Sequence, residues 1–348
     1  MSQLQDRLES ITNIDHIVVG THIPLQDCRV APNRPLTSMV DGYAFFPGPA
    51  SGLGIEFEIF IPKRIQRQLL PRDREPRART ERFRVYVRNP YCFPVTFVES
   101  ICAEPGGEPS EGVIVVREFL RDAFEQSDDN GLAFDWLGPS PFHADFFLLE
   151  GTEEQAYDRR GFVCGQVPGK GYDTFVFHFD PCRYDGPTDA KDAWFREFGD
   201  ELGLFYRGVH ARIMRVRRWE NVESLVDDLL ALFRRRGLRA VLGRIVRAPG
   251  QIREATIALV EFERHDLGVA YDMQVQYADL VAIVGEPYID RAIRAEMNNR
   301  LDYGSRQTRD IIELLESRRA RAVEQGVVLL SAILGGAVGA LITMAVAP

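Results

Sequence analysis

Two His-x-Asp pairs are the strongest candidates for catalytic or metal-binding residues in this sequence. His143 and Asp145 lie in the segment FHADFF, and His178 and Asp180 lie in FHFDP. Side chains two positions apart on a strand share one face, so two neighbouring strands would bring four metal-capable groups together. Imidazole and carboxylate groups suit a divalent transition metal or general acid–base catalysis. The same pattern is also typical of polar outer faces on two half-buried strands.

Other catalytic motifs are missing or incomplete. The segment GQVPGKG, from Gly165 to Gly171, is one residue shorter than a phosphate-binding loop and has glycine where that loop carries serine or threonine. We interpret it as a hairpin turn. The five cysteines show no CxxC spacing, which argues against a zinc ribbon or a disulfide framework. We therefore predict no cofactor, apart from a divalent metal if the His-x-Asp pairs converge, and the sequence favours a protein that is not an enzyme.

The elements that would position these residues indicate an α+β fold, with a β-rich first half. In residues 13–100, β-branched and aromatic residues between glycine and proline breaks predict strands, and RFRVYVRN alternates as a half-exposed strand does. Between these strands, the segment KRIQRQLLPRDREPRARTER in the basic stretch 63–88 is expected to be a surface loop or a long hairpin connection. A helix is predicted over 110–126. The aromatic strands LAFDWLG and FHADFFLLEG follow, and then a hairpin formed by GFVCGQV and YDTFVFHFD.

Beyond residue 186 the pattern is helical. We expect one helix over 189–218, a second that is capped by Asn221, and a third over 251–284. Residues 288–347 could form one continuous helix about 90 Å long at about 1.5 Å per residue, with Gly304 as a bend. An aromatic face is predicted to pack the helical half against the strands; it comprises Trp194, Phe195, Phe198, Phe205 and Tyr206.

These patterns divide the chain into four consecutive regions. They are a β-rich α+β domain in 1–185, a helical region packed on it in 186–286, a helical stalk in 287–325 and a transmembrane anchor in 326–347. Charge follows a different division, because residues 99–204 carry 8 basic and 23 acidic side chains while both flanking segments are slightly basic.

The anchor is predicted from a segment without charge, GVVLLSAILGGAVGALITMAVA, at 326–347. As a helix it would span about 33 Å, close to the roughly 30 Å hydrocarbon core of a bilayer. Arg318, Arg319 and Arg321 precede it, and the positive-inside rule places such residues in the cytosol. We expect a single-pass, tail-anchored protein of a bacterial or archaeal inner membrane, with its N-terminal bulk in the cytoplasm. A buried apolar helix of a soluble protein is the alternative.

Small residues within the anchor indicate helix–helix packing in lipid. Gly335 and Gly339 form a GxxxG motif, with Ala332 and Gly336 beside it, and such residues let two helices approach closely. Together with an apolar stripe along 288–325, they predict a homo-oligomer assembled through stalk and membrane helix. Glycine and alanine are also common in membrane helices generally, so composition alone is the alternative explanation.

Two basic clusters could contact lipid headgroups. Lys63, Arg64 and Arg67 begin the basic stretch 63–88, and the three arginines before the anchor form the second cluster. A membrane-anchored domain lies beside an anionic surface, so lipid is the expected partner and nucleic acid is not. A solvated surface segment is the alternative for the first cluster.

The order of an α/β domain, long helices and a membrane helix resembles CorA-type magnesium channels over roughly 186–347. That family has a second membrane helix and a Gly-Met-Asn motif, and this sequence has neither. The resemblance implies a homo-oligomer with a helical stalk. The sequence therefore predicts an oligomeric membrane protein with a cytosolic sensing or binding domain, acting as a membrane effector or pore former. The alternatives are a membrane-tethered metal-dependent hydrolase, and a scaffold or CorA-like transport component.

Overall fold

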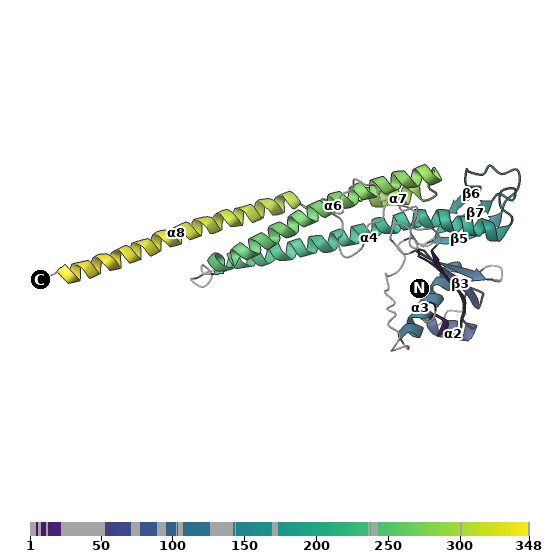
Figure 1. The fold of residues 1–348 in the computed structure, drawn as a ribbon, viewed down its shortest axis with the longest axis horizontal. Helices are drawn as coiled ribbons and strands as arrows, with labels where there is room; N and C mark the ends of the chain where they lie inside the picture. The colour runs from purple at the N-terminus through teal and green to yellow at the C-terminus, as the bar shows by residue number, and fades with distance from the viewer. Residues whose placement is uncertain are drawn as a thin grey trace. The chain divides into compact units, whose positions relative to one another are not determined.

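The computed structural model shows an α+β protein with two sheets and several long helices (Figure 1). It describes residues 5, 8–11, 13–21, 53–70, 77–88, 95–101, 103, 107–125, 142, 144–168, 173–235, 237, 243–299 and 301–346. Within these ranges, side chains at 20, 21, 53, 329, 330 and 335–346 are not described. The chain divides into two compact units. Unit 1 is Met1–Val209 with Met273–Met297, and unit 2 is His210–Asp272 with Asn298–Pro348.

The first sheet of unit 1 is an antiparallel meander, as the β-rich pattern predicts. Its strands follow chain order: β1 (Ile14–Thr21), β2 (Leu53–Phe60), β3 (Arg82–Arg88) and β4 (Val95–Ile101). One face packs on helix α3 (Pro109–Glu125), which confirms the helix predicted over 110–126. The core between them contains Ile59, Phe83 and Val115, all nearly inaccessible to solvent.

The second sheet is mixed and has the strand order β5–β7–β6. β5 (Ala144–Glu150) runs parallel to β7 (Asp173–Phe179), and β6 (Phe162–Val167) pairs antiparallel with β7. That antiparallel pairing confirms the two strands of the predicted hairpin. Gly165 belongs to β6, and residues 169–172 of the predicted turn lie outside the described residues. The predicted strand LAFDWLG lies outside the described residues.

Helix α4 (Pro187–Arg234) passes from unit 1 into unit 2, and its first half packs against both sheets. Trp194 contacts Phe97 of β4 and Phe177 of β7, and Phe198 contacts Phe177 at 5.4 Å between ring centroids. The aromatic face predicted to join helix and strands is thus confirmed. Aromatic pairs at these distances stabilise packing beyond the area that they bury.

Three expectations about helices are wrong. Residues 63–69 form helix α2 (Lys63–Leu69) rather than a loop, because the fully buried Gln66 donates from Nε2 to the carbonyls of Ile61 and Thr80 at 2.7 Å.

α4 also continues through Asn221 without a break. Trp219 and Val222 on either side are buried in one helical cluster, and packing of that kind outweighs a capping preference.

The long helix expected from residue 288 is also interrupted. It is replaced by α7 (Asp290–Asn298) and α8 (Ser305–Val346). Gly304 lies between them with a φ of +64°, a left-handed conformation that glycine adopts at little cost. Its N–H donates to Asp302 Oδ1 at 2.9 Å, which closes the turn before α8.

The described residues of unit 2 form a bundle of three helical segments: residues 210–234 of α4, residues 248–272 of α6 (Ala248–Val284), and α8. Trp219 and Phe262 pack against Tyr303, with ring centroids 5.4 Å from the Tyr303 ring in both cases. Further along the bundle, Ile312 and Leu315 of α8 enter the same buried cluster. Arg309 of α8 forms an ion pair with Glu263 of α6.

Candidate functional site: the Arg160 cluster

An ionic cluster in unit 1 surrounds the buried guanidinium group of Arg160. This Arg160 cluster comprises Asp158, Arg160, Glu197, Glu201 and Tyr288. Asp158 and Arg160 belong to the turn before β6, Glu197 and Glu201 lie on α4, and Tyr288 lies between α6 and α7. Residues far apart in the chain thus meet around one guanidinium group.

Arg160 reaches three parts of unit 1. Its Nη1 donates to Glu201 Oε1 at 2.6 Å, its Nε donates to Asp158 Oδ2 at 3.0 Å, and its Nη2 donates to the Glu286 carbonyl at 3.1 Å. The guanidinium lies 3.6 Å from the centroid of the Tyr288 ring, a cation–π distance. Arg160 suits this role because its planar fork holds several donors in fixed directions.

The two closest carboxylates are satisfied on both oxygens. Glu201 has no exposed surface, and its Oε2 accepts a hydrogen bond from the Ile289 N–H at 3.1 Å. Asp158 accepts from the Tyr288 hydroxyl at 2.7 Å, and its other oxygen accepts from the N–H groups of Arg160 and Phe162. The cluster therefore ties the β6 turn to α4 and to the α6–α7 connection.

Burial sets the protonation of the neighbouring acids. It raises the pKa of Glu201 to about 7, although the Arg160 charge opposes the shift. It raises the pKa of Asp200 to about 7 against the opposing charge of Arg88. Asp158 behaves differently: burial works against its charged form, but the hydrogen bonds from Phe162, Tyr288 and Arg160 outweigh this and lower its pKa.

A carboxyl group with a pKa near 7 has the acidity that general acid–base catalysis requires. Glu201, however, is fully enclosed and both its oxygens are already bonded, so a substrate has no access to it. Burial raises the pKa of the Cys164 thiol to about 12, which leaves it protonated and weakly nucleophilic. The arrangement supports a structural role for the cluster rather than a reaction centre.

The His-x-Asp residues are only partly brought together. Their strands β5 and β7 are neighbours, which a shared site requires. Asp145, however, pairs with Thr174, four positions before His178, or about 13 Å along the strand. Asp180 follows β7 and accepts from the Cys182 N–H at 2.9 Å. His143 lies outside the described residues. Where side chains are described, no group of three or more His, Cys, Asp or Glu residues could hold a metal.

The predicted lipid-binding residues are accessible. Lys63, Arg64 and Arg67 are exposed on α2 in unit 1. On α8 in unit 2, Arg318 and Arg321 are exposed and Arg319 is half-buried. Contact with lipid stays a prediction for both groups.

The C-terminal packing residues belong to α8. Ala332 is exposed, whereas Gly335, Gly336 and Gly339 lie outside the residues whose side chains are described. Considering only residues that the structure describes, we find no helix that is both long and apolar enough to span a membrane.

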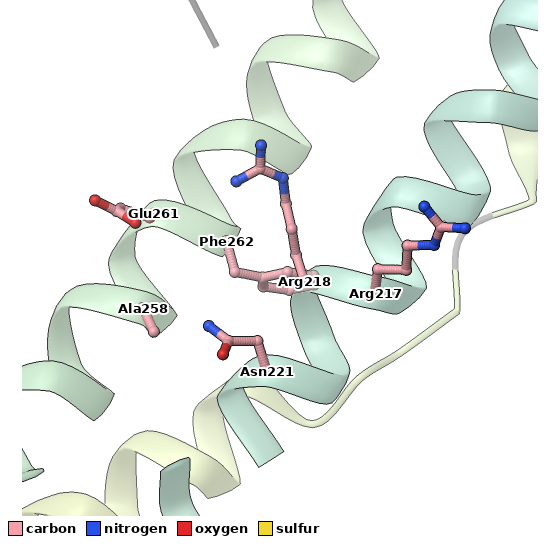
Figure 2. A pocket seen from close by; sticks show the side chains of 6 residues that line it. All are labelled: Arg217, Arg218, Asn221, Ala258, Glu261 and Phe262. Atoms are coloured by element: carbon pink, nitrogen blue, oxygen red, sulfur yellow. The ribbon is translucent and has the colours of Figure 1, made fainter. Parts of the chain in front are cut away.

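A small pocket in unit 2 is lined by α4 and α6 residues, shown in Figure 2: Arg217, Arg218, Asn221, Ala258, Glu261 and Phe262. Its volume is about 170 Å³, below the roughly 300–1,000 Å³ typical of ligand pockets. Glu261 and Arg217 point away from each other on opposite sides of it (Figure 2). The polar groups do not converge on a common point, so the pocket does not form a ligand site.

Comparison with family models, with curated proteins and with solved structures finds no match to this chain.

The sequence contains one signal for the Arg160 cluster that its apolar pattern hides. Phe198, Glu201 and Phe205 follow helical spacing on one face of α4, so a carboxylate occupies a position of the apolar stripe. A charge at such a position indicates a buried ion pair. The partner, Arg160, is 41 residues away and could not be chosen from the sequence.

Proposed function

We propose that this protein is a membrane-anchored homo-oligomer. Its α+β unit binds or senses a partner at the cytosolic face, and its helical bundle connects that unit to the bilayer. The observation that carries the proposal is the continuity of α8, which runs from Ser305 through the charge-free segment to Val346. At about 1.5 Å per residue, the 22 residues from 326 would extend about 33 Å, enough to cross a hydrocarbon core.

The exposed residues at the start of that segment support a bilayer environment. Large aliphatic side chains are accessible to solvent there: Val327, Val328, Ile333 and Leu334. Leaving a side chain of this size in water forgoes about 1.5–3 kcal/mol relative to full burial. Hydrocarbon chains would cover all four, and the preceding arginines suit an anionic headgroup layer.

Oligomer formation through the membrane helix rests on the small residues of that segment. Ala332, Gly335, Gly336 and Gly339 recur at spacings that allow close approach of two helices. We propose that this surface joins neighbouring copies in lipid. Whether the joined helices also permeabilise the bilayer is measured by leakage of a dye from liposomes that contain the full chain.

The anchor is tested by carbonate extraction of membranes that contain the full chain. Wild-type protein should remain in the membrane pellet. Ile333→Arg with Leu334→Arg places two charges near the centre of the span, at about 2.5–3.5 kcal/mol each, and should release most of the protein.

The matched control, Ser317→Arg, adds a charge to an exposed position of α8 before the apolar segment and should leave the protein in the pellet. Wild-type protein that is extracted by carbonate would overturn the proposed anchor.

A further inference from the structure

Helix α6 carries an apolar stripe on the side that faces away from the bundle interior. This α6 stripe comprises Ile257, Val260 and Leu267, which are 44%, 52% and 67% exposed. Their spacing of three and seven residues places them on one face of the helix. Leu259 and Phe262, which pack in the bundle, lie on the opposite face.

Helix α8 carries a second stripe beside its own buried face. This α8 stripe comprises Ile311 and Leu314, which are 36% and 51% exposed. The adjacent Ile312 and Leu315 are buried in the bundle. Unit 2 therefore presents two separate apolar surfaces, one on the back of α6 and one on the flank of α8.

The two stripes lie at the same level of the bundle. The ion pair between Glu263 of α6 and Arg309 of α8 gives a common reference, and the two helices run in opposite directions (Figure 1). At about 1.5 Å per residue, Val260 and Ile311 lie about 4.5 Å and 3 Å from this reference, on the same side of it. Ile257 and Leu314 lie about 9 Å and 7.5 Å from it by the same rise.

Exposed side chains of opposite charge lie at similar heights on α6 and α8. Glu254 and Arg318 each lie nine residues from the reference pair, or about 13.5 Å along the bundle. Arg264 and Asp310 each lie one residue from it, on opposite sides. In the part of the chain that the structure describes, none of these four residues has an ion-pair partner.

Pairing of like stripes would bring like charges together. Copies anchored in one bilayer are parallel, so a two-fold contact between α6 stripes would place Arg264 beside Arg264, and one between α8 stripes would place Arg318 beside Arg318. Contact between the α6 stripe of one copy and the α8 stripe of another avoids both of these like-charge pairs and places apolar side chains opposite each other. Interfaces between two different surfaces close into rings when the rotation allows it.

We propose that the α6 stripe of one copy packs against the α8 stripe of the next, with Glu254 facing Arg318 across the interface. The proposal rests on the proposed membrane anchor, which makes the copies parallel and holds their bundles at one height. Buried apolar area stabilises the contact, and the charge pairs fix its register and exclude like-stripe pairing.

The test uses two full-length chains with different affinity tags, co-expressed and extracted in mild detergent. One carries Glu254→Arg and the other carries Arg318→Glu. When both tagged chains carry the same variant, the amount that co-purifies should be at least fivefold lower than for wild type. Co-expressed together, the two variants should recover association, because position 254 of each chain then meets the opposite charge at 318 of the other. Asp228→Arg, an exposed reversal on α4, is the matched control and should associate as wild type does.

Cysteine cross-linking supplies the second readout. Val260→Cys in one chain and Leu314→Cys in the other should form a disulfide-linked pair well above the background of the native cysteines. The proposal would be overturned if Val260→Cys chains cross-link to each other as well as they do to Leu314→Cys chains. It would also be overturned if co-expressed Glu254→Arg and Arg318→Glu chains associate no better than either variant alone. Carbonate extraction of the same samples separates the two proposals. Protein that stays in the membrane but forms no disulfide between positions 260 and 314 contradicts only the interface. Protein that forms this disulfide but is extracted from the membrane contradicts only the anchor.

Discussion

The two units bury their large apolar residues to very different extents. Unit 1 encloses phenylalanines completely, among them Phe83, Phe177 and Phe198, and places an ionic cluster beside them. Among the described residues of unit 2, only Leu229 and Leu259 belong to the largest fully buried side chains, and aliphatic residues as large are exposed on α6 and α8. A three-helix bundle has a thin interior, so much of its apolar surface faces outward. Unit 1 therefore encloses large aromatic side chains within its own fold, whereas unit 2 leaves large aliphatic side chains exposed along two of its helices.

The largest effect should come from the aromatic packing of unit 1. Phe198→Ala removes a fully buried ring that contacts Phe146, Phe177 and Trp194. Truncation of a buried phenylalanine costs about 3–5 kcal/mol of unfolding free energy, and urea denaturation measures this loss. Phe147→Ala, on the exposed side of β5, should cost less than about 1 kcal/mol. Equal losses for both variants would contradict the contrast between the two faces of the sheet.

The Arg160 cluster should give the next largest effect. Arg160→Met leaves Glu201 buried without its cation, and breaking such a pair costs about 3 kcal/mol. Arg159→Met, the exposed neighbour, should change stability by less than about 0.5 kcal/mol.

Adding Glu201→Gln to Arg160→Met replaces the buried carboxyl group that has lost its partner and should restore part of the loss. Hydrogen exchange in β6 and in the first half of α4 locates the effect in unit 1. Unaltered exchange in Arg160→Met would show that the cluster does not hold these elements together.

The pH dependence of stability should differ between the two units, and this effect should be smaller than that of Arg160→Met. The folded-state pKa values of Asp200 and Glu201 are raised to about 7, whereas unfolded carboxyl groups titrate near pH 4. Between these values the folded state binds more protons, so unit 1 should gain roughly 1–3 kcal/mol as the pH falls from about 7.5 to 5.

Below about pH 4 the lowered pKa of Asp158 acts in the opposite direction, and its contribution to stability is lost. Hydrogen exchange at pH 5 and 7.5, corrected for the intrinsic rate, measures the change in unit 1. Asp200→Asn should reduce the slope. Stability that rises with pH over this range would contradict the assignment.

The smallest effect should come from the exposed stripe of unit 2. Leu267→Ser changes a side chain that is 67% exposed, so the unfolding free energy of the monomer should change by less than about 0.5 kcal/mol. Leu259→Ala, at a buried position of the same helix, should cost about 2–5 kcal/mol. Urea denaturation in dilute detergent solution measures both, and a large loss in Leu267→Ser would show that the stripe stabilises the single chain.

Local patterns predicted most elements correctly where one periodicity dominates. The alternation in β3, the helical character of α3 and the antiparallel pairing of β6 with β7 all follow from residues close in the chain. Helix boundaries were less predictable. Asn221 has the character of a cap, yet α4 continues because Trp219 and Val222 are buried in the bundle.

Composition and periodicity within single segments were enough to predict the α+β class, the charge-free segment at 326–347 and the aromatic face of α4. Which residues meet depends on how the whole chain folds. The tertiary structure placed Arg160 against Glu201 and Tyr288, and it separated Asp145 from His178 by strand register. The register of a sheet and the partner of a buried charge are set by contacts between distant segments, and no local pattern records them.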